Sequence, residues 1–192
     1  DPALRVGSGL ERVGRVPATQ HPAHEGPFDR ALELVHDGQG DALSRHIDRY
    51  QAPHPSRIAI FAGLDYDAWR TEAAFGELEA QRLRDSAARG ARGLKVWKHL
   101  GLVARDPAGR LVSVDDVRLD PLWRAAAELG LPVVIHVADP RAFFDPLDGA
   151  NERWEELHAH PDWHFWPTAT DPDGTGYPGF DEILGALDRM VG

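Results

Sequence analysis

The chain has 192 residues, a mass of 21.2 kDa and no cysteine, and 42% of its residues are hydrophobic. This length and composition favour one globular domain with a packed core, and they exclude a disulfide framework, a thiolate metal site and a cysteine nucleophile. The 31 acidic residues outnumber the 21 basic ones, and the formal net charge of −10 argues against nucleic acid as a partner because a phosphate backbone repels such a chain.

The chain divides into two segments of different character. Residues 1–30 carry four prolines and no sustained apolar periodicity, and we interpret them as an N-terminal arm or loop. In residues 31–192, short apolar runs alternate with longer amphipathic stretches. That alternation is typical of βα units that build a parallel sheet.

The first two predicted units occupy the stretch after the arm. Residues 31–36 (ALELVH) form the first predicted strand, and a helix follows at about 41–50. Residues 57–64 (RIAIFAGL) form the second strand, because a continuous apolar run suits a strand covered on both faces. A longer helix is predicted at about 71–89, with Gly90 next to its C-terminal end.

The apolar spacing in these two helices predicts which side chains point toward the core. In the first helix the inward positions are Leu43 and Ile47. In the second helix they are Phe75, Leu78 and Leu83.

The third and fourth predicted strands carry the residues of greatest interest. Residues 93–98 (GLKVWK) form the third strand and lead through a long loop, 99–116, to a helix at about 121–129. The fourth strand, 132–137 (PVVIHV), is a β-branched run that follows directly after a helix stop at Gly130.

Two more helices are predicted, at about 151–160 and 180–190. The resulting fold class is α/β, with parallel strands, crossover helices and TIM-barrel-like (β/α) units that make about half of an eight-stranded barrel. An incomplete barrel has bare sheet edges, so we expect a homo-oligomer, a complementing barrel half or the N-terminal arm to cover them.

Functional groups of (β/α) barrels lie at the C-terminal ends of the strands, where the βα loops form the mouth of the site. The residues at these places are His36 with Asp37, Asp65, Lys95 with Lys98 and His99, and His136 with Asp139.

His136 stands near the end of an otherwise apolar strand and, by alternation, shares a face with Val134. If that face is the barrel interior, the imidazole is a candidate ligand for zinc or a similar divalent ion, and Asp139 is a candidate to orient it. The alternative is a core or rim histidine with a satisfied hydrogen bond.

Lys95 lies inside an apolar strand, where a bare ammonium group is costly to bury. It is either a substrate-binding cation or a carbamylated lysine that offers an oxygen ligand to a metal; the alternative is a lysine that extends to the solvated rim. Lys98 and His99 are candidates to bind an anionic substrate, and their alternative is an ordinary solvated rim.

Three stretches of the sequence, residues 35–66, 91–102 and 115–163, resemble the amidohydrolase-related proteins grouped with aminocarboxymuconate-semialdehyde decarboxylase. The resemblance implies a barrel that holds divalent metal at its mouth, most often zinc, with manganese possible. It implies that His136 is a metal ligand and Lys95 a candidate bridging ligand. The implied chemistry is attack of a metal-activated water on a C–N or ester bond of a small-molecule substrate, or decarboxylation of an aromatic acid.

The resemblance also implies ligands that we do not find, namely a His-x-His from the first strand, a histidine from the sixth and an aspartate from the eighth. One hypothesis is therefore a hydrolase completed by other segments or by a partner chain. Another is a non-catalytic remnant or interaction module. A third uses His21 and His24 of the arm as substitute metal ligands.

No run of about 18 apolar residues is present, so the sequence predicts no membrane partner. With the absence of cysteine, this fits a cytoplasmic protein.

Overall fold

The computed structural model of the chain describes residues 32–35, 40–137, 140–165 and 176–192. The predicted arm, residues 1–30, lies outside the described residues.

The structure confirms all four predicted strands, each shorter than its apolar run. They are β1 (Leu32–Val35), β2 (Ile58–Phe61), β3 (Leu94–Val96) and β4 (Val133–Ile135). β1 pairs with β2, and β3 pairs with β4, both in parallel.

An isolated parallel bridge between Ala62 and Leu94 joins the two strand pairs. The Ala62 amide donates to the Gly93 carbonyl at 2.9 Å, and the Lys95 amide donates to the Ala62 carbonyl at 2.8 Å. The described strands therefore follow one another in chain order with the same direction, and the α/β class with parallel strands is confirmed.

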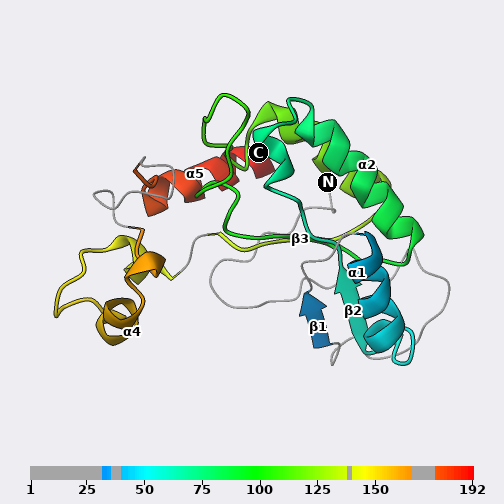
Figure 1. The fold of residues 1–192 in the computed structure, drawn as a ribbon, viewed down its shortest axis with the longest axis horizontal. Coiled ribbons are helices and arrows are strands. Elements are labelled where there is room, and N and C mark those ends of the chain that lie inside the picture. The colour runs from blue at the N-terminus through cyan, green and yellow to red at the C-terminus, as the bar shows by residue number, and fades with distance from the viewer. Residues whose placement is uncertain (1–31, 36–39, 138–139, 166–175) are drawn as a thin grey trace.

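Five α-helices accompany the strands in the described part of the chain (Figure 1). They are α1 (Gly40–His46), α2 (Phe75–Ala88), α3 (Asp120–Glu128), α4 (Trp154–Ala159) and α5 (Phe180–Val191). α2 and α3 pack side by side over one face of the sheet (Figure 1). No described helix is long and apolar enough to span a bilayer.

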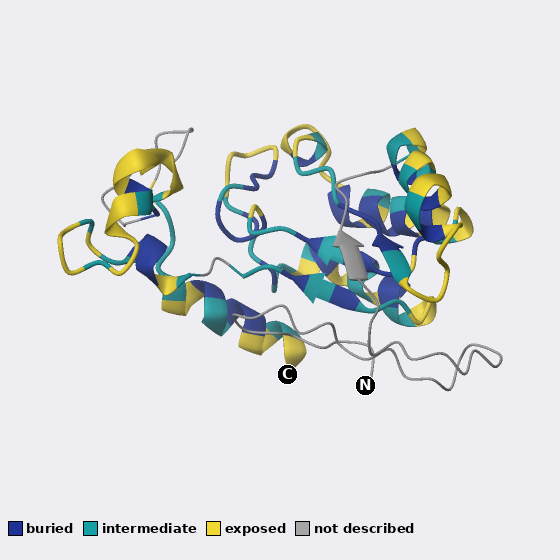
Figure 2. Cartoon of the chain, turned by 90° about the horizontal axis from the view of Figure 1, so that it is seen from below, coloured by how far each residue is buried: buried dark blue, intermediate teal, exposed yellow. Residues whose placement is uncertain are grey.

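A first core fills the space between the strands and the helices α2 and α3. Alternate strand side chains point into it, so that Leu94, Val96, Val133 and Ile135 are all buried. Helices contribute their inward stripes, and Figure 2 shows buried positions facing the strands while exposed positions cover the outer helix faces.

A second, smaller core lies beside the first. It contains Leu102, Phe143, Phe144, Leu157, Phe165 and Ile183. α5 belongs to both cores, because its Ile183 lies in the second while Ala186 and Leu187 lie in the first.

Close packing accounts for one glycine in the first core. A Cβ added at Gly93 would lie 2.5 Å from the ring of Phe61, so only glycine allows β2 and β3 to approach here. Phe61 itself is buried.

The structure has helices where the sequence predicts them, but the ends of two helices and the inward face of α2 differ from the prediction. The second long helix was predicted to start near residue 71. In the structure, a separate 3-10 turn occupies Ala68–Arg70 and α2 begins only at Phe75. After His46 the backbone of the first helix changes to a π turn, Ile47–Gln51. Leu78 is only half-buried, whereas its neighbour Glu79 is fully buried.

The long loop 99–116 has structure of its own. Arg105 and Leu111 form an antiparallel bridge, and the Asp106 amide donates to the Arg110 carbonyl at 2.9 Å. The loop therefore forms a tight hairpin-like turn, and Gly109 takes the positive φ of 74° that this turn requires.

Candidate functional site

The C-terminal ends of β3 and β4 bring three of the chain's chemically active side chains together. Lys95 lies opposite Val134 in the register, and the His136 amide donates to the Val96 carbonyl at 2.9 Å. Because Val96 and Ile135 point into the first core, alternation places Lys95, Trp97 and His136 on the other face of the sheet. We call these three residues the strand-end cluster.

The geometry of the strand-end cluster centres on the indole ring of Trp97. The Lys95 ammonium lies 5.1 Å from the centre of that ring, within the range of a cation–π contact. The His136 imidazole lies 6.0 Å from the indole between ring centres, with the planes tilted by 53°. All three side chains are half-buried, so the cluster has both a packed side and a solvent side.

Tyr66, in the loop after β2, fixes the backbone of Trp97. The Trp97 amide donates to the Tyr66 hydroxyl oxygen at 2.9 Å, and the hydroxyl donates in turn to the Trp97 carbonyl at 3.5 Å. The Tyr66 ring stacks on His99 with 5.4 Å between ring centres and packs edge-on against Trp69. The predicted substrate residue His99 is therefore exposed but held by a stacked ring.

A buried carboxylate supports this tyrosine from behind. Glu79 of α2 accepts from the Trp69 indole N–H at 3.2 Å and from Arg82 at 2.7 Å. Trp69 is fully buried and stacks on Phe75. The sequence carries one signal of this support that the predictions did not use, the aromatic residues in the loop that follows β2.

The indole nitrogen of Trp97 is unusual, because it is buried and has no hydrogen-bond partner among the described residues. Buried N–H groups in folded proteins almost always have a partner. Leaving one without a partner costs about 1–3 kcal/mol of desolvation free energy.

Lys98 points to a different part of the molecule. Its ammonium lies 4.9 Å from the centre of the Phe165 ring and 5.4 Å from that of Phe143, both residues of the second core. Lys98 was predicted to bind substrate, but its ammonium group lies over aromatic rings of the second core. The Lys95 ammonium group lies over Trp97 instead.

Several predicted site residues lie outside the described residues. These are Asp139, His36, Asp37, His21 and His24.

Asp65, in contrast, is described and has local contacts. It accepts from the Ala68 amide at 3.3 Å, and its second oxygen lies 3.4 Å from an Arg82 nitrogen. Its carboxylate holds the turn after β2 in place.

A metal site needs several convergent ligands, and His136 is the only imidazole of the strand-end cluster. Within residues 32–35, 40–137, 140–165 and 176–192, no three His, Asp or Glu side chains form a group that could hold a metal ion. The residues described here therefore do not by themselves fit a catalytic zinc site, which uses three protein ligands and an open position.

One His-x-His pair does occur in the chain, away from the predicted first strand. Its members are His158, in the last turn of α4, and His160, directly after that helix. Both are exposed, and each is stacked on a tryptophan, His158 on Trp154 and His160 on Trp163. Their position excludes them as the first-strand ligands.

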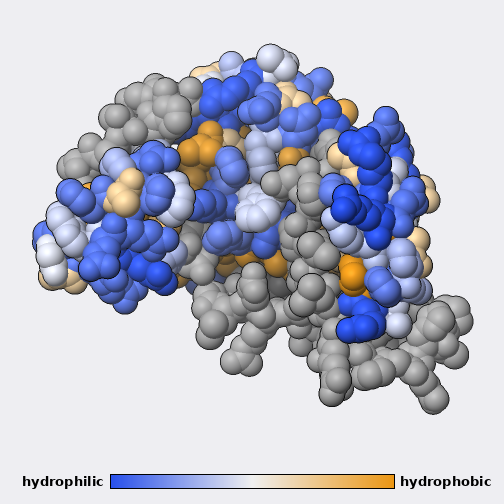
Figure 3. All heavy atoms as spheres, turned by 60° about the horizontal axis from the view of Figure 1, so that its bottom comes forward, coloured by the Kyte–Doolittle hydropathy of each residue, from blue (hydrophilic) through white to orange (hydrophobic). Residues whose placement is uncertain are grey.

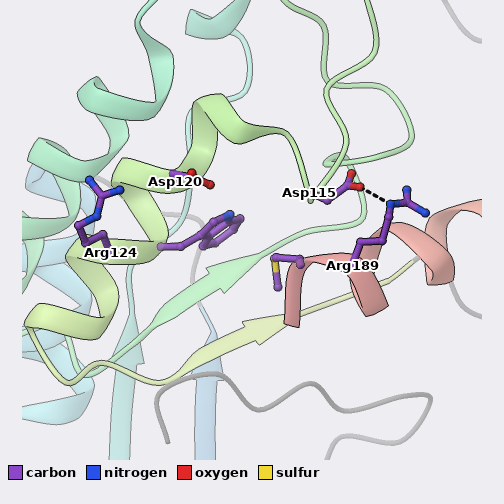
Figure 4. Close-up of a pocket in the computed structure, with 6 residues that line it drawn as sticks. Asp115, Asp120, Arg124 and Arg189 are labelled. Carbon is purple, nitrogen blue, oxygen red and sulfur yellow. Dashed lines mark hydrogen bonds and ion pairs between the residues drawn. The ribbon is translucent and has the colours of Figure 1, made fainter. Parts of the chain in front are cut away.

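An open pocket of about 300 Å³ lies between α3 and α5 (Figure 4). Its lining residues are Asp115, Asp120, Trp123, Arg124, Arg189 and Met190. Figure 4 shows Arg189 reaching from α5 to Asp115, and the two groups are 2.7 Å apart.

The charges of this pocket are already balanced. Burial raises the pKa of Asp115, but hydrogen bonds from Ser113 and Arg189 outweigh burial and lower it. Asp120 and Arg124 are exposed. The pocket is therefore a solvent-exposed groove between two helices. On the face of the molecule that Figure 3 shows, hydrophobic residues form small separate patches among hydrophilic ones.

No family profile matches the chain, and comparisons with curated proteins and with solved structures find no match either. The case for a function therefore depends on the chain's own side chains.

Proposed function

We propose that this chain is an amidohydrolase-like (β/α) barrel segment and that its strand-end cluster is part of a site for a small-molecule substrate. The observation that carries this proposal is that Trp97 and His136 lie at the C-terminal ends of neighbouring parallel strands, with Lys95 of β3 on the same face of the sheet. That end of the strands is where barrel enzymes place their functional groups.

The barrel itself is supported by the order of the strands. Parallel strands in chain order, joined by helices that pack on one face, are the repeating unit of a (β/α) barrel. A second copy of the chain or a complementing half would close the sheet, cover its edges and leave the strand-end cluster facing the interior.

The proposed roles follow from the chemistry of each side chain. His136 is the metal ligand, and Asp139 orients its ring. Lys95 binds a negative group of the substrate or, if carbamylated, offers an oxygen to the metal; Lys98 and His99 bind the substrate at the rim. A bound zinc or manganese ion would supply an activated water for attack on a C–N or ester bond.

The remaining metal ligands have to come from outside the described residues or from a partner chain, because His136 and Lys95 are too few. Decarboxylation of an aromatic acid needs the same completed site.

Elemental analysis of the purified full chain tests the proposal. We expect roughly one equivalent of zinc or manganese in the native chain and about a tenfold loss in His136→Ala, because removing a ligand weakens the site sharply. The matched control is His158→Ala, since that exposed histidine lies on α4. A native chain with less than about a tenth of an equivalent of metal contradicts the proposal.

A second candidate function is a non-catalytic interaction module that keeps the fold without the chemistry. The observation in its favour is the lack of a three-ligand group among the described residues. On this hypothesis, His136→Ala changes neither the metal content nor the hydrolysis of amide and ester substrates. Measuring both properties in the native chain and in His136→Ala decides between the two functions.

A further inference from the structure

We propose that the strand-end cluster binds an oxyanion, a carboxylate or phosphate, and that the indole N–H of Trp97 is one of its donors. This inference rests on the proposed function for the location of the site, and it adds the chemical class of the ligand and a binding residue.

The Trp97 indole offers a donor that the described residues leave unused. Trp97 Nε1 is buried and has no hydrogen-bond partner in the described part of the chain, while the Trp97 backbone uses both its amide and its carbonyl on Tyr66. A ligand atom that accepts from Nε1 would remove the penalty of a buried, unpaired donor. A donor-only indole requires that this atom be an acceptor.

A positive charge lies beside the Trp97 indole. Lys95 forms no ion pair with a described carboxylate, and its ammonium lies 5.1 Å from the centre of the Trp97 ring. An ammonium group also only donates hydrogen bonds. Two donor-only groups side by side, one of them positively charged, favour an acceptor with negative charge.

Neighbouring side chains hold Trp97 in place. Tyr66 holds the Trp97 backbone, and the buried pair Trp69 and Glu79 packs behind Tyr66. Donors held before the ligand arrives cost less ordering on binding. The His136 ring, 6.0 Å from the indole ring between centres, borders the same cluster.

On this proposal, the ligand reaches the indole by displacing the Lys95 side chain. Trp97 Nε1 itself has no exposed surface, but the Trp97 and Lys95 side chains are only half-buried. Lys95 has a four-carbon stem, so an oxyanion can draw its ammonium off the ring face and approach the indole edge.

Indole NMR on the full chain tests this inference. The six tryptophans give separate ¹H–¹⁵N indole signals, and Trp97→Phe identifies the one from Trp97 because it removes only that N–H. Benzoate and inorganic phosphate are titrated separately at constant ionic strength. We expect the Trp97 signal to move downfield with saturation, while the signal of exposed Trp154 stays in place.

Lys95→Met should weaken this binding by about tenfold, because a charge-assisted hydrogen bond is lost. Its matched control, Arg124→Met, removes an exposed cation from α3 and should leave the affinity unchanged. Dispersed signals from the other tryptophans establish that each variant is folded. Saturation with benzoate alone identifies a carboxylate ligand, and saturation with phosphate alone identifies a phosphate.

Two results would overturn the inference: a Trp97 signal that neither probe moves, or a shift that survives Lys95→Met unchanged. A signal that neither probe moves and that is also protected from exchange would mean that a buried water satisfies the indole. Failure of the oxyanion inference can be told apart from failure of the proposed hydrolase function, because the metal content of the chain tests the hydrolase function alone. A metal-free chain that still binds benzoate keeps the oxyanion site and loses the hydrolase.

Discussion

Hydrogen bonds from two arginines converge on the carboxylate of Asp106, which is buried at the turn of the 99–116 loop. Arg118 donates to it at 2.8 Å and the Arg110 Nε at 2.9 Å, while the Ala108 and Arg110 amides donate to its other oxygen. The Arg118 hydrogen bond, followed by the Arg110 amide, holds the pKa of Asp106 well below its usual range. Arg118 also pairs with Asp116, and this pairing raises the pKa of Arg118.

This arrangement predicts a pH dependence of stability. The pKa of Asp106 is lower in the folded chain than the value of about 3.9 in an unfolded one. Its contribution is therefore complete above that unfolded value and is lost as the pH falls through the folded one. Asp106→Asn should lower the midpoint of thermal unfolding by several degrees at pH 7, and the difference from the native chain should shrink below pH about 4.

Thermal unfolding of both chains followed by circular dichroism at a series of pH values measures this. Asp67→Asn, which changes an exposed carboxyl group, is the matched control and should show little effect at any pH. The difference in unfolding midpoint between Asp106→Asn and the native chain could instead stay constant down to pH 3. That result would show that the arginines do not lower the pKa of Asp106 in the folded chain.

Residue-level prediction failed where a polar group is buried. Spacing predicted Leu78 as an inward residue, but Glu79 is the buried one and Leu78 is half-buried. A hydrophobic pattern cannot foresee this, because the burial of Glu79 depends on Trp69 and Arg82 as partners. The indole of Trp69 comes from a separate turn, so only the folded chain brings donor and acceptor together.

At the scale of elements, sequence patterns found every described strand and α-helix but placed their ends poorly. The strands were found because β-branched runs follow clear helix stops, such as Gly130 with its φ of 63° before β4. The start of α2 was misplaced because tertiary contact, not helix propensity, decides it. At this start, Gly76 packs against the Arg118 carbonyl of the 3-10 turn Val117–Leu119.

Gly76→Ala sets helix propensity against packing. Propensity alone predicts a gain of about 1 kcal/mol in the free energy of unfolding, because alanine is the best helix former. A Cβ at position 76 would instead collide with the backbone carbonyl of Arg118, which cannot rotate away. We expect packing to win, with a net loss of about 1–3 kcal/mol measured by urea denaturation.

Gly185→Ala is the matched control for this variant. It also lies inside a helix, α5, but its Cβ would make only an ordinary contact of 3.5 Å with the Arg189 side chain. Here propensity should act unopposed and add up to about 1 kcal/mol. Stabilisation by both alanines would disprove the packing of α2 against the turn.

At the scale of the whole molecule, the sequence predicted that His136 shares a strand face with Val134, but not which residue of the neighbouring strand lies opposite. The parallel register of β3 and β4 places Lys95 opposite Val134, and the period of two in a strand then puts Lys95 and His136 on the same face. The contacts of Trp97 with Tyr66 were not predictable, because they join a strand end to a loop that precedes it by 31 residues. Long-range contacts of this kind leave no periodic trace in a sequence.

The two cores differ in size, and α5 joins them. Ile183 fills the second core, whereas Leu187, one helical turn later, fills the first. Either residue replaced by alanine loses buried apolar surface and leaves a cavity, at a cost of about 2–5 kcal/mol. The consequences should nevertheless differ, because the second core has far fewer buried residues than the first.

We expect Leu187→Ala to lower the midpoint of global unfolding in urea. Ile183→Ala should act locally, because a small core opens before the whole chain does. Hydrogen exchange in residues 141–165, which contain Phe143 and Leu157, should then accelerate by about tenfold or more, while exchange in β3 and β4 stays slow. Equal acceleration in both regions by Ile183→Ala would mean that the cores unfold as one cooperative unit.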